Sequence, residues 1–500
     1  MLSFLNTNII FFSIFIILAY FIWNKWISFH VRTNKNTPPS PQKLPIIGNL
    51  HQLGSSPHRT LQALSHKHGP LMLLHLGSVP MLVASSAEAA REIMKTHDLI
   101  FANRPKLSIP DTLLYGSKDI TFSPYGEYWR QVKSIAIVHL LNSTRVQSFR
   151  QIRETEIALT IKMIENRCGS IIDLSEFLVS LTNNIICKVA LGRTYSGIKF
   201  KGLLRRLMHV LGVFSFGNYI PKLSWIDRLS GLEDQARKVA KDFDDFLEGV
   251  VEEHVNNNRG VYDKSYEDQD LVDILLDVQR QNQTGFSLQR DTVKAVILNI
   301  FAAGTDTTFT SLEWTISELI RHPREMEKLR QEAIEIAQGR PMILESDLEK
   351  MQYLKAVIKE SLRLHAPVPL LVPRESTQDV KLMGYDIPAG TQVIINASAI
   401  GRDPNLWEEP DAFKPERFLN NTIDYKGLHF ELLPFGAGRR GCPGIQFAMV
   451  VNELALANVV YKFNLALPNG IKDEDLDMSE TNGITVHKKL PLLVMATPRF

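Results

Sequence analysis

Residues 433–448 read Leu433-Pro-Phe-Gly-Ala-Gly-Arg-Arg-Gly-Cys-Pro-Gly-Ile-Gln-Phe-Ala448. Four glycines in this stretch permit a tight loop with positive φ angles, at Gly436, Gly438, Gly441 and Gly444. Arg439 and Arg440 bring positive charge near the thiol of Cys442, which favours its thiolate form. The apolar run 445–460 predicts a helix whose positive N-terminus faces the sulfur. The sequence therefore predicts a loop in which a thiolate persists and accepts hydrogen bonds from backbone N–H groups.

The composition narrows the class of protein. The 56 basic and 54 acidic residues leave a net charge of +2, which argues against a nucleic-acid binder driven by bulk charge. The chain has only three cysteines, Cys168, Cys187 and Cys442, which indicates a reducing compartment rather than a disulfide scaffold. Cys168 and Cys187 are expected to be small buried apolar residues. No Cys-x-x-Cys pair or Cys/His cluster with zinc spacing occurs, so a structural zinc site is not expected.

The N-terminus is strongly apolar. Residues 8–23 carry no charge, and with their apolar flanks they reach the ~20 residues that a bilayer requires. No Lys or Arg precedes the stretch, whereas positive residues follow it at Lys25, His30, Arg32 and Lys35. This asymmetry keeps the C-terminal side in the cytosol. Residues 1–30 are therefore predicted to be a transmembrane signal anchor; the alternative is a cleaved signal peptide, whose apolar region is shorter and follows its basic residues.

After the anchor, residues 31–50 contain four prolines and are predicted to form a stiff, non-helical hinge. Residues 51–500 are predicted to be one large domain, mainly α with small β-sheets. The turn residues Gly77 to Pro80 between two apolar runs predict a β-hairpin. Short strands are also expected at 381–386, 392–396 and 490–496.

Helical periodicity dominates the rest of the domain. Apolar residues recur at three- and four-residue spacing, which predicts long helices in 154–166, 232–254 and 291–321. Ser346-Asp-Leu-Glu349 reads as a capping box that opens another helix. Its apolar side is expected to comprise Leu348, Met351, Leu354, Val357 and Ile358.

The pattern Phe-Gly-x-Gly-x-Arg-x-Cys-x-Gly at residues 435–444 resembles the haem-binding loop of the cytochrome P450 superfamily at every defining position. Glu360-Ser-Leu-Arg363 resembles the family's Glu-x-x-Arg pair, and the segment around Arg417 resembles the one that supplies a second arginine. By itself, the Glu360–Arg363 spacing is that of an exposed ion pair of little value. The resemblance, which covers essentially the whole chain, implies the cytochrome P450 fold. It also implies a haem b cofactor (iron protoporphyrin IX) with Cys442 as axial iron ligand, and a buried structural cluster of Glu360, Arg363 and Arg417.

Gly304-Thr-Asp-Thr-Thr308 interrupts the apolar run of the helix predicted at 291–321. Glycine and threonine are unfavourable in mid-helix, and such local conflicts are expected at functional sites. The segment resembles the family's acid–alcohol motif, in which the helix is distorted above the haem. The resemblance implies that Asp306 and Thr307 are catalytic and help to deliver protons to bound oxygen. The alternative is that Thr307 only bonds a carbonyl one turn back.

The resemblance also implies which residues grip the cofactor. Trp129-Arg-Gln-Val-Lys133 is similar to the family's Trp-x-x-x-Arg segment, which holds a haem propionate. Lys133 departs from that pattern and lacks the bidentate geometry of arginine. Arg374 and Arg440 match the other propionate-binding cations. The exposed side of these elements, with Arg130, Lys133 and Arg439, is a candidate docking patch for an acidic reductase.

The resemblance implies that four segments of this chain line a substrate pocket, and most of their residues are apolar. The pocket is expected to include Ile109, Leu113, Phe301, Ala302, Val368, Leu371 and Ile484. Such a lining suits a terpenoid or a small phenolic such as a coumarin. The sequence is similar to that of plant microsomal members of the family in specialised metabolism, and in places to that of furanocoumarin-forming members.

The resemblance implies a monooxygenase anchored in the endoplasmic reticulum membrane, with its domain in the cytosol. It would use O2 and electrons from NADPH, passed through NADPH–cytochrome P450 reductase, to oxidise a small apolar metabolite. One alternative is a haem-thiolate isomerase or dehydratase that needs no O2, against which the intact Asp306-Thr307 pair argues. The other is a non-catalytic, membrane-anchored haem-binding protein.

Overall fold

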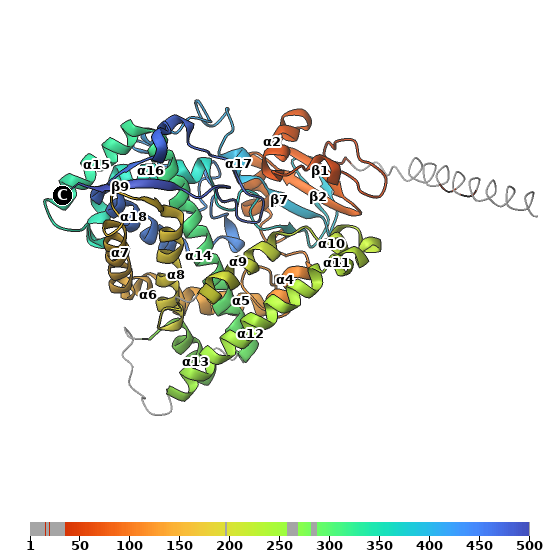
Figure 1. Cartoon of the computed structure of the whole chain (residues 1–500). Helices are drawn as coiled ribbons and strands as arrows, with labels where there is room; N and C mark the ends of the chain where they lie inside the picture. Colours follow the sequence, from red (N-terminus) through yellow and green to blue (C-terminus); the bar gives the residue numbers. More distant parts are fainter. Residues whose placement is uncertain are drawn as a thin grey trace, which may run out of the picture.

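The computed structural model describes residues 16, 20, 36–195, 198–257, 269–281 and 288–499. The predicted anchor at 1–30 lies outside these residues, apart from the isolated positions Ile16 and Tyr20. Figure 1 shows a body rich in helices at one side, and a smaller part built from sheet and helix α2 at the other. The prediction of one mainly helical domain with small sheets is confirmed.

Apolar periodicity accounts for the helices. Their bounds are α2 (Pro57–His68), α3 (Ala87–Arg91), α4 (Ser108–Leu113), α5 (Glu127–Ile135), α6 (Ser143–Ser148), α7 (Arg150–Glu165), α8 (Leu174–Leu191), α9 (Ile198–Gly212), α10 (Phe216–Tyr219), α11 (Trp225–Leu229), α12 (Leu232–Asn257), α13 (Leu271–Gln281), α14 (Arg290–Arg321), α15 (Pro323–Ala337), α16 (Gln352–Leu364), α17 (Ala397–Ile400) and α18 (Ile445–Lys462). The three long helices predicted from the sequence are confirmed as α7, α12 and α14.

The largest sheet has the order β1-β2-β7-β4. Its strands are β1 (Leu71–Leu76), β2 (Val79–Ala84), β7 (Gln392–Ile395) and β4 (Arg374–Glu375). The predicted hairpin is confirmed: β1 and β2 pair antiparallel, with Leu76 opposite Val79. Strand β2 then pairs with β7 in parallel, which joins segments more than 300 residues apart. The smaller sheets are β3 (Ile171–Asp173), β9 (Leu493–Pro498) and β8 (Phe463–Ala466), and the pair β5 (Val380–Leu382) and β6 (Tyr385–Ile387).

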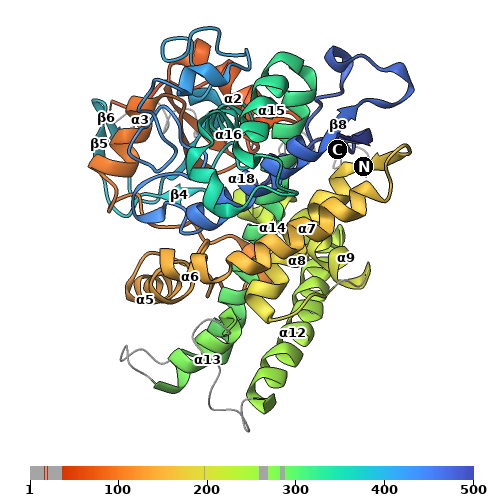
Figure 2. The ribbon, with the colours of Figure 1, turned by 90° about the vertical axis from the view of Figure 1, so that its left-hand side faces the viewer.

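Helix α14 runs through the middle of the helical body and packs against α8, α16 and α18 (Figure 2). Most of its side chains are buried on all sides, and the buried ones include polar residues such as Thr310, Glu313 and Ser317 besides the apolar stretch 296–303. Helix α8 is the one helix among the described residues whose length and hydropathy would suffice to cross a membrane. It is largely buried against α14 and α7, which is the position of a core helix.

The predicted capping box at Ser346–Glu349 is wrong. Residues Glu345–Lys350 form a short 3-10 helix, and α16 begins only at Gln352. The reciprocal bond comes from Asp347, whose carboxylate accepts the backbone N–H of Leu344 at 2.9 Å. The turn starts earlier because Glu345 is held from α7 by Arg153, at 2.8 Å. The predicted apolar side is nevertheless buried as expected, at Leu348, Met351, Leu354, Val357 and Ile358.

The proline-rich segment is attached to the domain from Asn36 onward. The carbonyl of Pro39 accepts the N–H of Leu73, and the N–H of Asn49 donates to His75 O at 2.7 Å. At Gly48, φ is +60° and a Cβ atom would lie 2.1 Å from His75 O, so this close approach to β1 requires glycine. The described part of the predicted hinge is therefore a surface layer on β1 rather than a free spacer.

Candidate functional site

The Cys442 loop is held by its own backbone and by glycine. The N–H of Cys442 donates to Phe435 O at 3.0 Å, and α18 begins three residues later at Ile445. At Gly438, φ is +67° and a Cβ atom would lie 2.3 Å from Met94 O. The loop therefore docks on the segment after α3, at a distance that no other residue permits. The sequence pattern of the loop already contained this requirement.

The side chain of Cys442 is solvent-accessible, although the protein surrounds it closely. A hollow inside the protein reconciles the two observations, because a thiol that lines it is reached by solvent without lying on the outer surface. Burial raises the pKa of the Cys442 thiol, while the N–H of Gly444 and the charge of Lys133 lower it. The expectation that Arg439 and Arg440 supply the stabilising charge is wrong: the cation that acts on the sulfur is Lys133.

Arg440 turns away from the sulfur, into the wall of the loop. Its guanidinium donates to Ala102 O and Ser123 O, each at 2.7 Å, and lies 4.1 Å from the ring centroid of Trp129. Trp129 is itself fixed, because its indole N–H donates to Ile120 O at 2.9 Å. Arg440 and Trp129, predicted to be cofactor-binding residues, are thus brought into direct contact.

Arg374 and Lys133 lie beside this pair. Arg374 is buried; it donates to Ala437 O at 2.8 Å and lies 3.4 Å from Asp98. Lys133 donates to the carbonyls of Arg439 and Gly441 and lies 5.1 Å from the Trp129 ring centroid. Lys133 therefore faces inward, and of the three cations predicted for a docking patch it contributes least to the outer surface. Arg439 is exposed but lies near Asp98.

The cations of this region repel one another. Burial, followed by the charge of Arg374, lowers the pKa of Arg440 to about 9. Burial, followed by the charge of Arg440, lowers the pKa of Lys133 to about 8. Arg104, which the sequence reasoning did not single out, is buried too, and burial with the charges of Arg440 and Arg374 lowers its pKa. Buried positive charge in excess of its acidic partners fits a bound group that carries carboxylates, as the haem propionates do.

Helix α14 is continuous from Arg290 to Arg321, so the expected distortion does not appear as a break in the helix. A Cβ atom at Gly304 would lie 2.8 Å from Ile186 Cδ1, so this glycine allows α8 to approach. The hydroxyl of Thr307 donates to Ala303 O at 2.7 Å, which is the bond one turn back that the sequence left open. Ala303 is nevertheless exposed within a largely buried helix, which indicates that this face of α14 borders a hollow.

Asp306 has a partner that the sequence reasoning missed. His487, in the segment before β9, places Nε2 3.3 Å from Asp306 Oδ1. The second carboxylate oxygen, Oδ2, is buried and has no hydrogen-bond partner among the described residues. A histidine between Val486 and Lys488 carries no local pattern that would have revealed this contact, because the contact joins segments far apart in the chain.

Glu360, Arg363 and Arg417 form one buried cluster. Arg363 makes a two-pronged contact with Glu360, at 2.7 and 2.8 Å, and Arg417 Nε lies 3.0 Å from the same carboxylate. Arg363 also donates to the carbonyls of Gly401, Pro410 and Ala412. Glu360 and Arg363 are at most 1% exposed, so this is not the exposed ion pair that the spacing alone suggests. The cluster ties α16 to the segment that leads to the Cys442 loop.

The predicted pocket residues divide into two groups. Ile109, Leu113, Phe301 and Ala302 are buried within the main core. The partly exposed residues, which can line a hollow, are Val368, Leu371 and Ile484. Leu371 adopts φ +51°, and its Cδ1 would lie 3.6 Å from a Cβ atom at Gly436, which brings this side chain to the Cys442 loop.

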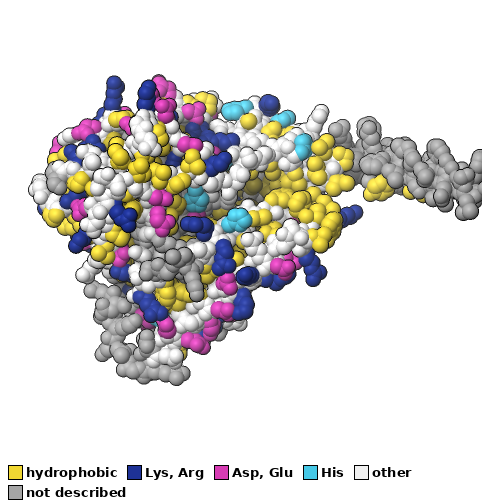
Figure 3. Space-filling view, in the orientation of Figure 1, with side chains coloured by type: hydrophobic (Ala, Val, Ile, Leu, Met, Phe, Trp, Pro, Cys, Tyr) yellow, Lys and Arg dark blue, Asp and Glu magenta, His cyan; other side chains and the backbone are white. Residues whose placement is uncertain are grey.

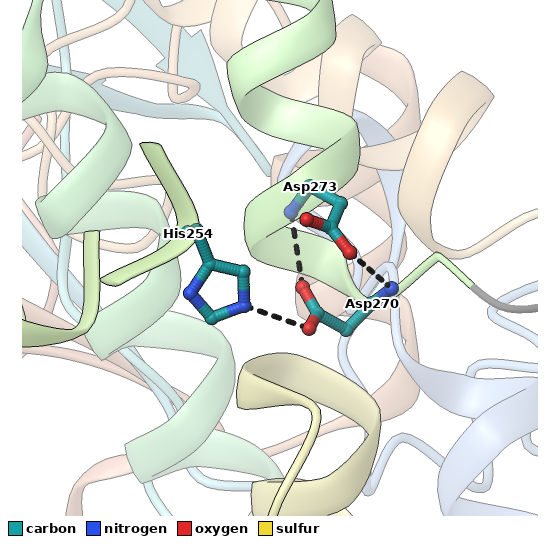
Figure 4. Close-up of side chains that lie close together, drawn as sticks. All are labelled: His254, Asp270 and Asp273. Carbon is teal, nitrogen blue, oxygen red and sulfur yellow. Dashed lines mark hydrogen bonds and ion pairs between the residues drawn. The ribbon is translucent and has the colours of Figure 1, made fainter. Parts of the chain in front are cut away.

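His254, Asp270 and Asp273 form the one cluster of potential metal ligands found among the described residues (Figure 4). Their polar atoms satisfy one another: His254 Nε2 lies 2.8 Å from Asp270 Oδ2, and the two aspartates exchange backbone-to-carboxylate bonds at the start of α13. This arrangement is that of a helix cap with a histidine partner. It requires no metal ion.

Comparison with known proteins identifies relatives along the whole chain. The family model described as "Cytochrome P450" matches residues 38–495. A "3-beta-hydroxylase" of Tanacetum parthenium is 60% identical, with 100% of both chains covered. A "Psoralen synthase" of Ammi majus is 50% identical over 98% of this chain and 97% of its own. A solved structure of a zebra fish cytochrome P450 with abiraterone is 27% identical, with a TM-score of 0.75 over 89% of this chain and 100% of that chain.

Proposed function

The chain belongs to the cytochrome P450 family, with plant relatives that include a psoralen synthase, and we propose that it oxidises a small apolar plant metabolite such as a terpenoid or a coumarin-like phenolic. Membership implies a haem cofactor and electrons that NADPH supplies through a reductase. The finer proposal concerns the substrate class and the roles of individual residues. It rests on one observation above all: an accessible thiol on a glycine-built loop lies beside an excess of buried cations.

Cys442 is the proposed axial ligand of the haem iron. When bound, haem supplies the redox chemistry that activates O2, and a thiolate ligand donates electron density that favours O–O cleavage. Within the protein, Lys133 lowers the pKa of the Cys442 thiol, and the N–H of Gly444 hydrogen-bonds to the sulfur. Both interactions favour the thiolate over the thiol.

Trp129, Lys133, Arg374 and Arg440 are the proposed anchors of the haem carboxylates. All four are already held by backbone carbonyls, so their positions change little when an anion arrives. Pre-set donors bind an anion without a further cost in side-chain entropy. Lys133 retains the charge of the family arginine, but it offers a point charge rather than a planar fork.

Asp306 and Thr307 are the proposed proton-delivering pair. The Thr307 hydroxyl donates to Ala303 O, which leaves its oxygen lone pairs free to accept from a water or an oxygen ligand. The partnerless Oδ2 of Asp306 is a second polar atom that requires water or a proton. A carboxyl group and a hydroxyl one residue apart can pass protons through such water.

The substrate class is proposed from the relatives and from the lining. The curated relatives named above are a hydroxylase and a psoralen synthase of plants. The half-buried residues Val368, Leu371 and Ile484 are apolar, which suits a ligand with few polar groups. The direct experiment measures the change in the haem absorption spectrum with a panel of plant terpenoids and phenolics, followed by reconstitution with reductase. Binding confined to polar or charged compounds would contradict the proposed class.

Replacing Thr307 with alanine is expected to lower product formed per NADPH by roughly tenfold or more, with hydrogen peroxide as the alternative product. The Thr307 hydroxyl is next to Asp306 in the sequence, and its loss leaves proton delivery incomplete. Ser317→Ala removes another α14 hydroxyl that bonds a carbonyl one turn back, and it measures the effect of such a bond on the helix. Unchanged coupling in Thr307→Ala would remove the residue from the proposed pair.

We also propose an endoplasmic-reticulum membrane location, with residues 1–30 as anchor, 31–50 as hinge and 51–500 as catalytic domain. Large apolar side chains are exposed around the β1–β2 turn and α11, at Leu44, Ile46, Phe214, Trp225 and Leu229. Figure 3 shows hydrophobic side chains gathered on this end of the molecule. Ser78 at the turn donates to Tyr219 O at 2.9 Å, which joins the two parts of this surface. An exposed apolar surface of this kind favours contact with lipid.

A chain that lacks residues 1–30 is expected to retain binding to phospholipid vesicles through this surface. The double substitution Trp225→Ser and Leu229→Ser is expected to weaken that binding at least roughly tenfold, because each large apolar side chain contributes about 1.5–3 kcal/mol when it is removed from water. Leu428→Ser is the control, since Leu428 is 73% exposed, close to the 78% of Leu229, but lies near the Cys442 loop. Equal loss in both variants, measured by co-sedimentation, would refute a specific lipid-facing surface.

A further inference from the structure

The segment before β9 crosses α14 at the catalytic turn. His487 lies between two α14 residues one turn apart: Nε2 is 3.3 Å from Asp306 Oδ1, and Nδ1 is 2.7 Å from Thr310 Oγ1. The imidazole ring also stacks on Phe309, with ring centroids 5.6 Å apart and planes at 29°. Three contacts on one helix face therefore hold the ring in a single orientation against the carboxylate.

The contacts and charges around this ring favour its protonated form. Thr310 Oγ1 lies 2.7 Å from both Asp306 O and His487 Nδ1, so its hydroxyl hydrogen can go to either acceptor. When it goes to Asp306 O, Nδ1 donates to Thr310 while Nε2 donates to the carboxylate, and the ring is then an imidazolium. Burial lowers the pKa of His487, but the hydrogen bond and charge of Asp306, with a contribution from Glu313, raise it overall above its ordinary value.

The other charged groups at this point compensate one another. Glu313, two turns along α14, accepts a hydrogen bond from Ser175 of α8 and interacts with Lys488. Lys488 donates to Asp477 O and lies 5.6 Å from the ring centroid of Trp314. Burial raises the pKa of Glu313, which reduces its negative charge near the histidine. Asp306 is thus the carboxylate to which His487 is directly bonded.

We propose that His487 is a positioning residue for Asp306 and the group through which protons from solvent reach it. This inference rests on the proposed function, in which Asp306 delivers protons. His487 engages Oδ1, which fixes the orientation of the carboxylate, and Oδ2 is buried without a hydrogen-bond partner among the described residues. The side chain of His487 is 24% exposed and that of Asp306 is 13% exposed, so the histidine is the more accessible member.

The proton balance is simple. His487 Nε2–H passes its proton to Asp306 Oδ1. Rotation of the carboxyl group about its Cβ–Cγ bond turns the protonated oxygen away from His487, and that oxygen then releases the proton to a water. The neutral imidazole then takes a proton from solvent, which restores the starting state. Reduction of one O2 to a substrate oxygen and one water consumes two such protons, and the two electrons come from NADPH through the reductase. No bond between heavy atoms of His487 or Asp306 changes.

His487→Gln is expected to lower product per NADPH about tenfold at neutral pH, less than loss of a general acid itself, which costs on the order of 10²–10⁴-fold. Substrate affinity should stay unchanged, because His487 does not line the proposed pocket. In the wild type, the charged ring is present below its folded pKa, which lies above 6.5. Coupling should therefore decline as pH rises through that value, and this decline should be absent in His487→Gln.

A readout independent of turnover follows the ring itself. Histidine labelled with carbon-13 at Cε1 can be titrated by NMR in the reduced, carbon-monoxide-bound holoenzyme. The His487 resonance is the one among 14 that is lost in His487→Gln. Its midpoint is expected above 6.5, and it should fall in Asp306→Asn, since the carboxylate raises the pKa of His487. A midpoint that Asp306→Asn leaves in place would overturn the inference even if a coupling defect were found.

Matched variants separate this inference from the function on which it rests. His254→Gln breaks another His–Asp pair, between α12 and the residue just before α13, and its coupling should match the wild type (Figure 4). His487→Arg retains a cation and should restore part of the coupling at high pH. If Asp306→Asn uncouples the enzyme and His487→Gln does not, the role of His487 is refuted; if Asp306→Asn also stays coupled, the proposed proton delivery itself fails. If a variant lacks the thiolate-haem spectrum, its coupling is not interpreted. The NMR titration of His487 in the wild type then decides, since a midpoint above 6.5 is expected.

Discussion

Cys442→Ala is expected to abolish the thiolate-type spectrum of the reduced carbon monoxide complex and to reduce turnover to below one-thousandth. Three decades in rate correspond to a barrier roughly 4 kcal/mol higher. The physical reason is specific to this position. Cys442 is the accessible cysteine beside the buried cations, and the N–H of Gly444 and the charge of Lys133 both favour its thiolate. Neither of the other two cysteines has this environment.

Cys187→Ala is the matched control for this result. Cys187 lies fully buried in α8, where burial raises the pKa of its thiol to about 12, so it behaves as a small apolar residue. Its removal should leave the spectrum in place and lower the free energy of unfolding only modestly. Cys442→Ser, which keeps the loop geometry, should lose the spectrum as Cys442→Ala does. A thiolate spectrum and activity that survive in Cys442→Ala would refute the assignment of the ligand.

Glu360→Gln is expected to lower the free energy of unfolding by about 3–5 kcal/mol, because it leaves two arginines near an uncharged amide in the protein interior. Glu360 accepts from Arg363 at 2.7 Å and from Arg417 at 3.0 Å, and it is completely buried. The measurement is denaturant unfolding of the holoenzyme, followed by both tryptophan fluorescence and haem absorbance. Loss of haem ahead of global unfolding is expected, since the cluster holds the segment that leads to the Cys442 loop.

The chain contains its own control for burial. Arg330 and Glu327 on α15 have the same i,i+3 spacing and a contact of 2.7 Å, but Glu327 is largely exposed. Glu327→Gln is expected to change the free energy of unfolding by no more than about 1 kcal/mol. If Glu360→Gln lowers the free energy of unfolding by no more than Glu327→Gln does, Glu360 contributes only as a surface ion pair does.

Much of the fold was predictable from the sequence, because its motifs depend on the local conformation of the backbone. Of the four glycines predicted to allow positive φ in the Cys442 loop, Gly436 and Gly438 adopt it, whereas Gly441 and Gly444 have negative φ. The hairpin of β1 and β2 and the long helices α7, α12 and α14 follow from periodicity. The resemblance to the cytochrome P450 family indicated which residues belong to the site. The family model, which matches residues 38–495, agrees with that resemblance.

The expectation about which cations act on Cys442 failed because charges interact through space and not along the chain. Arg439 and Arg440 are closer in sequence to Cys442 than Lys133 is, yet Arg440 is drawn to three carbonyls and to Trp129. Lys133, some 300 residues away, reaches the carbonyl of Gly441 and acts on the sulfur. Sequence distance gives no information about which direction a long side chain takes once its backbone is packed.

The Cys442 loop, the long helices and the polar turn of α14 were predictable from the order of residues, because these features depend on local conformation and on periodicity. The partners of these residues were not predictable, because they come from elements that meet only in the folded protein. The contact between Thr310 and His487 spans 177 residues, and the burial of Glu360 depends on the chain that closes over α16. Such contacts arise from the packing of distant elements, and no local pattern records them.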